Sequence, residues 1–484
     1  MIRRGKTEGW LQLPPEARLA WVTLNDVHFN LTQPGVVEGR GGALLATQDL
    51  DADDQAHRVL LTVPRDLILS LERVREHAKV DRDFREVLES LGDLGRTPRG
   101  AILSFLILQA SISSPHLPYH VGVRSAFSDY VKSLPMEKLP TTWNAEELQL
   151  LVGTTLGQAT GAKMKSLRHE YELLCSSVEH TRWYQAVQDH LDFDDWLQAD
   201  AMYRSRALDF PNIGHCMVPC IDLANHAAGD ATVALYEKTA NGDAVLLLID
   251  GKTVSRGEEV TITYGDEKGA SEMLFSYGFL DSGMDSAQTM LLSLTLPPED
   301  RYRAAKARIA DCAPGFNISE TPDGGVRWEG DYVWLLCVTE EDDLHFALAR
   351  TVDGVEDEVQ PLFQGKELTG GAAGLRTRLS GTPLWDVYHL RAISILQERV
   401  FSQMQILYST EEEVAARANG ADSAIPSSTF DAAMKLRELE FSLLNKAYET
   451  FEHKKLELAQ SSVVTRYLAE MREEDLDHVP DDFS

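Results

Sequence analysis

The residues best suited to chemistry lie in three short segments near the middle of the chain. Asn225 and His226 are adjacent and follow an apolar run, Tyr264 ends a later apolar stretch, and Tyr277 is followed directly by Gly-Phe. An amide and an imidazole can bind the polar ends of a ligand, and a tyrosine hydroxyl can orient an incoming nucleophile. Taken singly, each residue has an ordinary explanation as a capped turn or a core tyrosine. Their combination and order favour a site where a ligand and a nucleophile meet.

Three common nucleotide and hydrolase motifs are not supported. Residues 251–253 read Gly-Lys-Thr like the end of a phosphate-binding loop, but Leu246 stands where that motif requires its first glycine. Residues 39–43 are rich in glycine, yet they do not read G-x-G-x-x-G and no βαβ pattern follows them. The chain also lacks a G-x-S-x-G nucleophile elbow. We therefore expect neither a Rossmann cofactor site nor a serine hydrolase.

A cluster of His215, Cys216, Cys220 and His226 could suggest zinc. The spacing of the two cysteines is close to that of zinc sites, but the second pair of ligands that such a site needs is not found nearby. We expect Cys216 and Cys220 to be small buried side chains next to a loop, and we expect no metal.

Composition limits the class of partner. Lys and Arg number 46 against 76 Asp and Glu, which gives a net charge of -30, and hydrophobic residues make up 43% of the chain. Such a charge repels nucleic acids and anionic membranes and attracts basic proteins, although solubility alone would also explain it. Five cysteines favour a reducing compartment. The first residues show no secretory signal, and no apolar run reaches the ~18 residues of a membrane span.

Hydrophobic periodicity predicts the elements that position these segments. Strands are expected at 43–47, 59–63 and 260–264, and a hairpin at 231–249 turns at Asn241-Gly242. Apolar residues recur at helical spacing through 71–200, and again in 384–407 and 430–458.

The ordered motifs resemble those of the SET domain, in the branch of the Rubisco large-subunit lysine methyltransferases (class V-like methyltransferases that bind S-adenosylmethionine). The matching segments are Val218-Pro219 with Asp222 and Asn225-His226, Gly257-Glu258-Glu259 with Tyr264-Gly265, Tyr277-Gly278-Phe279, Glu38-Gly39-Arg40-Gly41, Val63-Pro64 with Ser70, and Ser205-Arg206-Ala207. Two departures stand out. Gly42-Ala43 are extra residues in the glycine-rich turn, and Leu208 replaces an aromatic residue of the family.

The resemblance implies an α+β fold: a SET-type β-fold with a helical insertion and a C-terminal all-helical domain. The expected parts are 20–75 and 201–285 as the two halves of the SET domain, 76–200 as the insertion, 290–470 as a substrate-binding domain and 471–484 as an acidic tail. No cysteine follows Cys337, so the zinc segment that closes many SET domains is missing, and the C-terminal domain is expected in its place.

The resemblance also implies a function: S-adenosylmethionine-dependent methylation of lysine in a non-histone protein. Tyr277 is the expected catalytic residue. The residues expected to bind the cofactor are Glu38, Gly39, Arg40, Arg206, Asn225, His226 and Tyr264. A basic protein substrate, such as a ribosomal protein, suits the acidic chain, which we expect to be a monomer in the cytoplasm or nucleus.

Two alternatives remain open at this point. One branch of the family methylates histidine, although Tyr277-Gly278 looks more like the lysine-directed members. The altered glycine turn also allows a catalytically silent SET-fold module that only binds partners.

Overall fold

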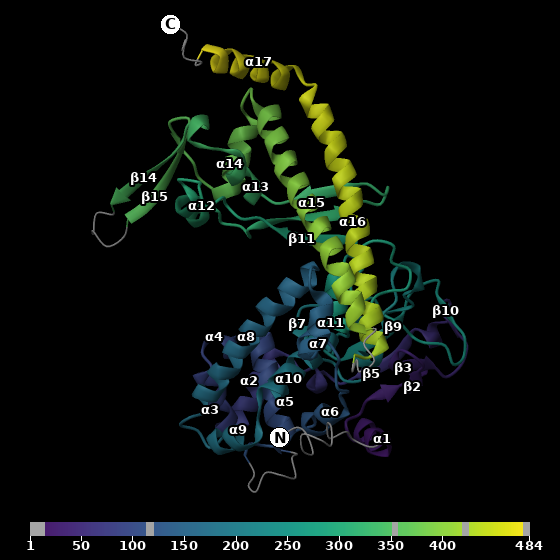
Figure 1. Cartoon of the computed structure of the whole chain (residues 1–484). Helices are drawn as coiled ribbons and strands as arrows, with labels where there is room; N and C mark the ends of the chain where they lie inside the picture. The colour runs from purple at the N-terminus through teal and green to yellow at the C-terminus, as the bar shows by residue number, and fades with distance from the viewer. Residues whose placement is uncertain (1–14, 113–120, 351–356, 419–424, 478–484) are drawn as a thin grey trace. The chain divides into compact units, whose positions relative to one another are not determined.

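The computed structural model describes residues 15–112, 121–350, 357–418 and 425–477 of the chain (Figure 1). These residues form two compact units, each assembled from segments that are separated in the sequence. The first unit comprises Met1–Asn144, Ala159–Asp266 and Leu274–Gly278, and the second comprises Ala145–Gln158, Glu267–Met273 and Phe279–Ser484. Two helices, α8 (Thr155–Ser177) and α11 (Ala270–Tyr277), begin in the second unit and end in the first.

The first unit contains a four-stranded antiparallel sheet in the order β1-β5-β9-β8. Its strands are His28–Phe29, Val59–Val63, Ala244–Leu248 and Ala234–Lys238. Strands β8 and β9 form the predicted hairpin, in which Tyr236 pairs with Leu246 and Gly242 in the turn adopts a φ of +92°. Most residues of β5 and β9 are buried, because apolar side chains project from both faces. The strand at 59–63 and the hairpin are thus confirmed.

Three two-stranded ribbons accompany this sheet. They pair β2 (Thr32–Val37) with β3 (Gly41–Ala46), β4 (Leu50–Asp51) with β10 (Thr253–Val254), and β6 (Leu208–Phe210) with β7 (Gly214–Cys216). One hydrophobic core joins the ribbons to the sheet, and it includes Leu44, Val218 and Ile262. Because early and late residues share this core, the N-terminal hairpin lies against the segment that contains Asn225 and His226.

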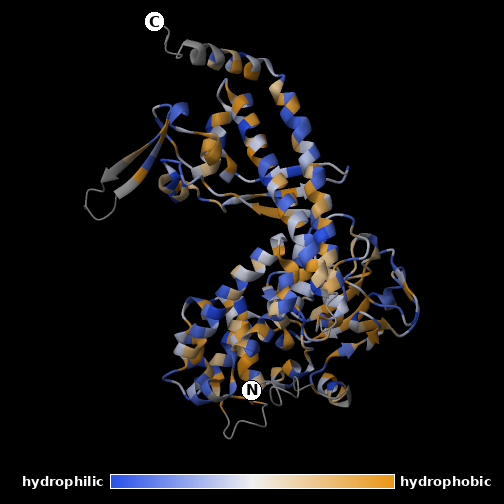
Figure 2. Ribbon diagram, viewed as in Figure 1, coloured by the Kyte–Doolittle hydropathy of each residue, from blue (hydrophilic) through white to orange (hydrophobic). Residues whose placement is uncertain are grey.

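Helices fill the predicted insertion. Those of the first unit between β5 and β6 are α2 (Leu71–Val80), α3 (Arg82–Ser90), α4 (Asp93–Arg96), α5 (Pro98–Ile112), α6 (Phe127–Ser133), the greater part of α8, α9 (Tyr184–His190) and α10 (Phe193–Arg206). Helix α5 is buried along nearly its whole length, and its apolar residues lie inside this bundle (Figure 2). Such a helix is apolar on all sides because other helices surround it.

A partly buried group of charges around the buried Asp200 links three of these helices. Arg99 donates two hydrogen bonds of 2.8 and 2.9 Å to the carboxylate of Glu170 and two of 3.0 and 2.6 Å to that of Asp200. Lys163 and Arg204 lie 3.5 and 3.2 Å from the Asp200 carboxylate. Burial would raise the pKa of Asp200, but the surrounding cations outweigh it and lower that pKa. The carboxylate of Asp200 therefore neutralises the positive charges of Arg99, Lys163 and Arg204, which lie between these helices.

The second unit corrects one prediction, because it is not all-helical. Its strands are β11 (Thr289–Ser293), β12 (Gly315–Glu320), β13 (Val326–Glu329), β14 (Leu344–Arg350), β15 (Asp357–Phe363) and β16 (Lys366–Glu367), which form two three-stranded sheets. In β11, Met290 and Leu292 are buried whereas Leu291 is exposed, which is the two-residue alternation of a strand. The prediction extended the helical pattern of 384–458 to residues 289–367, where buried and exposed side chains alternate every two residues, as in β11.

Helices complete the second unit. The shorter ones are α7 (Ala145–Leu148), α12 (Arg303–Ile309), α13 (Tyr332–Cys337), α14 (Gly371–Ser380) and α17 (Ser462–Asp477). The long pair α15 (Trp385–Ala418) and α16 (Ser427–Ala459) pack against each other, as predicted for 384–407 and 430–458 (Figure 1). Across the described residues, no helix combines the length and hydrophobicity needed to cross a bilayer.

Helix α16 holds the first turns of α8 and α11 through one buried carboxylate. Glu440 is 0% exposed and accepts hydrogen bonds from the Thr155 backbone N–H at 3.1 Å, the Thr155 hydroxyl at 2.5 Å and the Ser271 hydroxyl at 3.0 Å. One turn away, Arg437 donates to the Val152 carbonyl at 2.5 Å. Burial raises the pKa of Glu440, and the three donors offset that cost. The beginning of α11, whose last residue is Tyr277, is therefore anchored to α16.

We predict that Asp200→Asn lowers the free energy of unfolding by about 3–5 kcal/mol at neutral pH, because it leaves buried cations uncompensated. The lowered pKa of Asp200 means that its stabilising effect is present above the unfolded-state pKa of ~3.9 and is lost as the pH falls further. Urea denaturation at several pH values measures this, and the gap between wild type and variant should narrow below about pH 4. The control Glu86→Gln removes an exposed pair with Arg82 and should cost about 0–1 kcal/mol. Equal losses in the two variants would contradict the prediction.

Candidate functional site

The glycine-rich segment forms the tight turn of the β2–β3 hairpin. Val37 pairs with Gly41, so Glu38, Gly39 and Arg40 make up the exposed turn, which the Arg40 N–H closes on the Val37 carbonyl at 3.1 Å. Gly39 and Gly41 have φ values of +77° and +78°, a region that favours glycine. The extra pair at 42–43 lies within β3, opposite residues 35–36. The two extra residues therefore lengthen the hairpin and leave its turn intact.

Glu259 ties this turn to Asn225 and His226. Its carboxylate accepts a hydrogen bond from Arg40 Nη1 at 2.7 Å and another from Asn225 Nδ2 at 2.7 Å. Asn225 Nδ2 also donates to the Gly42 carbonyl at 3.1 Å, and Arg40 Nη2 donates to the His226 carbonyl. Charge-assisted hydrogen bonds are the stronger kind, so one carboxylate fixes two segments that are remote in the sequence.

The chain around Glu259 is not the predicted strand at 260–264, and that prediction was wrong. The Val260 N–H donates to the Leu44 carbonyl at 2.8 Å, whereas the Ile262 N–H donates to the Asn225 carbonyl at 3.0 Å. Glu259 and Ile262 thus form isolated bridges with two different segments, Glu259 with Leu45 and Ile262 with His226, and no continuous ladder forms. Apolar residues do alternate at 260–264, but they alternate because this segment lies between the hairpin and the Asn225 segment and bonds to both.

His226 and Tyr264 form the next layer of the site. His226 is 4% exposed, and its Nδ1 accepts a hydrogen bond of 2.9 Å from the Tyr264 backbone N–H. A neutral imidazole with an acceptor at Nδ1 carries its proton on Nε2. The Tyr264 hydroxyl donates to the Ala224 carbonyl at 3.0 Å, and burial raises the pKa of Tyr264. Both side chains are therefore held in one orientation by the backbone.

Tyr277 lies beside Tyr264, at the last residue of α11. The two ring centroids are 4.5 Å apart with an angle of 36° between the planes, and the Tyr277 side chain is half-buried. Gly278 follows with a φ of +81°, and a Cβ there would come within 3.1 Å of the Lys138 carbonyl. A glycine after Tyr277 thus lets the chain turn sharply against the insertion. The structure places the rings of His226, Tyr264 and Tyr277 next to one another, with Asn225 adjacent to His226 in the chain, and their predicted roles in binding and catalysis stay predictions.

Arg206 supports the loop before Asn225. Its Nε and Nη2 donate to Glu137 Oε1 at 3.1 and 2.9 Å, and its Nη1 donates to the Asp222 carbonyl at 2.8 Å. The Asp222 side chain accepts a hydrogen bond of 2.7 Å from the Tyr130 hydroxyl, and burial raises the pKa of Asp222. Arg206 therefore uses three of its five N–H groups inside the protein, and a cofactor contact through the others stays a prediction.

The two cysteines near the site are buried, as expected. Cys216 is 0% exposed and Cys220 is 9% exposed, and burial raises the pKa of Cys216 to about 12. Among the described residues no group of three or more His, Cys, Asp or Glu side chains is placed to hold a metal ion.

Comparison with known proteins agrees with this arrangement. No protein-family model matches the chain. SET domain-containing protein 8 of Schizosaccharomyces pombe is 27% identical over 355 residues, which cover 70% of this chain and 75% of that protein. The chloroplastic Rubisco large subunit N-methyltransferase of Pisum sativum is 28% identical over 289 residues, which cover 57% of this chain but only 52% of that enzyme. A crystal structure of the SET domain of LSMT bound to lysine and AdoHcy superposes with a TM-score of 0.65 at 22% identity, covering 97% of this chain and 98% of that chain.

The chain is thus similar in sequence to SET-domain methyltransferases of the Rubisco large-subunit type, and it shares the fold of their solved SET domain.

Motif matching alone did not reveal three residues that hold this SET-type site together. Glu259 belongs to the Gly-Glu-Glu motif, but the motif does not indicate its partners, because Arg40 and Asn225 approach it only in the folded chain. Glu137, which binds Arg206, lies in the insertion and follows no pattern. Arg204 lies two residues before Arg206, outside the matched segment.

Arg204 holds the end of α11 in the SET-type unit. Its Nη1 donates to the Phe275 carbonyl, its guanidinium lies 4.1 Å from the centre of the Phe275 ring, and its Nη2 donates to the Thr141 hydroxyl at 2.6 Å. A cation at a helix C-terminus is favourable, because the last carbonyls carry partial negative charge. Arg204 thereby fixes the turn that carries Tyr277.

We predict that Arg204→Gln speeds amide hydrogen exchange in the last turn of α11, residues 274–278, about tenfold, since it removes a charged hydrogen bond worth roughly 1.5–3 kcal/mol. Exchange measured by mass spectrometry on peptides from this region tests it. The control Arg301→Gln breaks an exposed pair with Glu340 and should leave these peptides unchanged. An unchanged exchange rate in Arg204→Gln would show that Arg204 does not hold this turn.

Proposed function

We propose that this protein is an S-adenosylmethionine-dependent protein-lysine N-methyltransferase that acts on a non-histone protein. The observation that carries the proposal is the placement of Tyr277 against Tyr264, next to Asn225 and His226, in a SET-type unit. The pea relative is an N-methyltransferase of the Rubisco large subunit, and the similar solved structure contains lysine and AdoHcy. Sequence motifs, geometry and relatives thus support the same reaction.

The residues present suit S-adenosylmethionine. A Cβ built on Gly39 or Gly41 would meet nothing within 4 Å, so the turn presents open backbone that a ligand can approach. Glu38 and Arg40 flank that backbone with charges of both signs, which suits a ligand with an ammonium and a carboxylate. Asn225 and His226 lie directly behind the turn, and Arg206 has two N–H groups left for a carboxylate.

Methyl transfer requires no covalent bond between the chain and either reactant. The bound cofactor supplies an electrophilic methyl group, and the chain has to align a lysine amine with it. Tyr277 orients that amine through its hydroxyl, and the Tyr264 ring forms the adjoining wall. A free lysine has a pKa of ~10.4, and burial beside a positive charge lowers it, so the amine can lose its proton without a dedicated base.

A basic protein is the substrate class that suits the chain. The net charge is -30, so a ribosomal or another basic non-histone protein would be attracted electrostatically. We propose that residues 290–470 dock this substrate and that the protein works as a monomer. All five cysteines are free, which supports a reducing compartment such as the cytoplasm or nucleus.

We predict that Tyr277→Phe lowers methyl transfer at least about 100-fold, because the hydroxyl that orients the amine is lost, while cofactor affinity changes less than about twofold. Labelled S-adenosylmethionine and a cell extract give the transfer rate, and calorimetry gives the affinity. Tyr184→Phe, on the surface of the insertion, is the control and should behave like wild type.

Other outcomes separate the alternatives. Cofactor binding without transfer to any basic protein fraction would indicate a silent SET-fold module. Label on histidine, identified by mass spectrometry, would indicate a histidine methyltransferase. Full activity of Tyr277→Phe would overturn the assigned role of Tyr277.

A further inference from the structure

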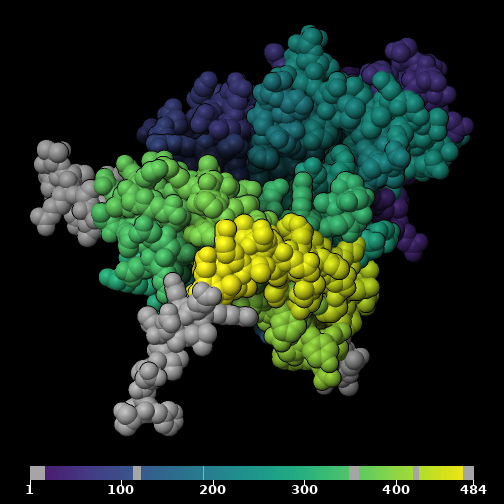
Figure 3. Space-filling model, turned by 90° about the horizontal axis from the view of Figure 1, so that it is seen from above, coloured from purple at the N-terminus to yellow at the C-terminus, as the bar shows by residue number. Residues whose placement is uncertain are grey.

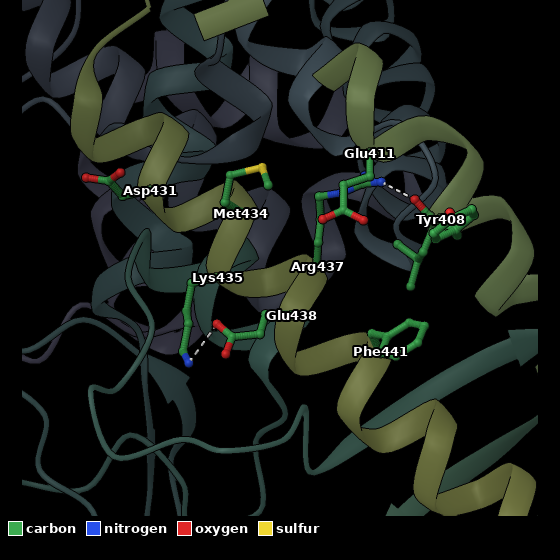
Figure 4. Close-up of a pocket in the computed structure, with 9 residues that line it drawn as sticks. Tyr408, Glu411, Asp431, Met434, Lys435, Arg437, Glu438 and Phe441 are labelled. Atoms are coloured by element: carbon green, nitrogen blue, oxygen red, sulfur yellow. Dashed lines mark hydrogen bonds and ion pairs between the residues drawn. The ribbon is translucent and has the colours of Figure 1, made fainter. Parts of the chain in front are cut away.

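The second unit carries a hollow on the surface of its two long helices. The hollow has a volume of about 610 Å³, and the described residues that line it all belong to α15 and α16 (Figure 4). In Figure 3 the C-terminal helices, coloured from lime to yellow, are exposed on the face seen from above. No residue that we assign to catalysis or cofactor binding lines the hollow.

Large apolar side chains are exposed in this hollow. Tyr408 on α15 is 76% exposed and Phe441 on α16 is 42% exposed. Met434 also lines the hollow, on the side toward Asp431 (Figure 4). Aromatic and methionine side chains that remain open to solvent in a hollow are typical of surfaces that bind other proteins.

The charge of the hollow selects the partner. Its carboxylates are Glu411, Asp431 and Glu438, all on exposed residues, and its cations are Lys435 and Arg437. Lys435 is already paired with Glu438 at 3.1 Å. Arg437 is only 5% exposed, because it turns inward. A partner therefore meets a surface with surplus negative charge around an apolar centre.

The inward bonds of Arg437 also make the hollow rigid. Its guanidinium donates to the carbonyls of Val152 at 2.5 Å and Leu407 at 2.6 Å and to the Thr410 hydroxyl at 2.7 Å. The bonds to Leu407 and Thr410 join α16 to α15 at the hollow, and the bond to Val152 joins α16 to the segment before α8. A preformed surface loses less conformational entropy on binding.

We propose that this hollow binds a basic segment of a partner protein. One large apolar side chain of that segment inserts between Tyr408 and Phe441, and neighbouring lysine or arginine side chains lie beside Glu411 and Asp431. Nucleic acid is disfavoured by the same carboxylates. The acidic residues at 471–484 of the chain have the wrong charge to fill it. That the partner is also the methylated protein rests on the proposed function, whereas binding itself does not.

Fluorescence anisotropy with a short labelled peptide tests the proposal. The peptide carries lysine and arginine on both sides of one phenylalanine, and the full-length protein is titrated into it. We expect saturable binding that weakens as salt is raised, because exposed charges are screened beyond about 8–10 Å. Combining Glu411→Lys, Asp431→Lys and Glu438→Lys should weaken binding at least about tenfold.

A matched variant separates the hollow from net charge. Combining Glu329→Lys, Glu367→Lys and Glu449→Lys changes the charge equally at exposed positions of the same unit outside the hollow, and it should change binding less than about threefold. Equal weakening by both triple variants would show attraction to net charge alone and would overturn the proposal.

The apolar centre is tested by a second pair of changes. Combining Tyr408→Ser with Phe441→Ser should weaken binding of the phenylalanine peptide about tenfold and leave a peptide with serine in its place unaffected. If the double variant bound the phenylalanine peptide as tightly as wild type does, the proposal would be overturned. Tyr277→Phe should bind the peptide normally, so loss of transfer with retained binding marks a failure of catalysis and not of docking.

Discussion

The site depends on the hydrogen bonds that the carboxylate of Glu259 accepts. This carboxylate binds Arg40 in the hairpin turn and Asn225 in the later segment, each at 2.7 Å. These two residues are far apart in the sequence, and only the fold brings them together. Without this carboxylate, the Arg40 guanidinium and the Asn225 amide would lose their shared partner, and their hydrogen bonds to the His226 and Gly42 carbonyls would have to hold the turn in place. The cofactor surface that we propose is therefore held in place by the ion pair between Arg40 and Glu259.

Two arginines of α10 extend this constraint to the tyrosines. Arg206 binds Glu137 and the Asp222 carbonyl, which fixes the loop before Asn225. Arg204 binds the Phe275 carbonyl, which fixes the turn that carries Tyr277. Neighbouring positions of one helix thus hold opposite sides of the site, and Glu440 anchors the other end of α11. These contacts are partly buried, so positioning here depends on charges that the protein largely neutralises internally.

The sequence predicted the parts of the site that are carried by local patterns. The motifs at 225–226, 264 and 277 indicate one site, and periodicity predicts the hairpin at 231–249 and the helices of the insertion. Three features could not be predicted in this way. The segment 260–264 has the alternation of a strand, but it is threaded between two neighbours. The strands at 289–367 are short, and long helical stripes follow them. Glu137 and Arg204 act through tertiary contacts, which leave no periodic trace in the sequence.

In the function that we propose, the turn at 38–40 and the Asn225–His226 segment form one cofactor site beside Tyr277. A crystal structure of the protein with S-adenosylhomocysteine tests it most directly. We predict density for the ligand against the backbone of Gly39 and the side chains of Asn225 and His226, with its sulfur directed toward the Tyr277 hydroxyl. Ligand density at another place on the protein, or no binding in a calorimetric titration of the same sample, would contradict the account.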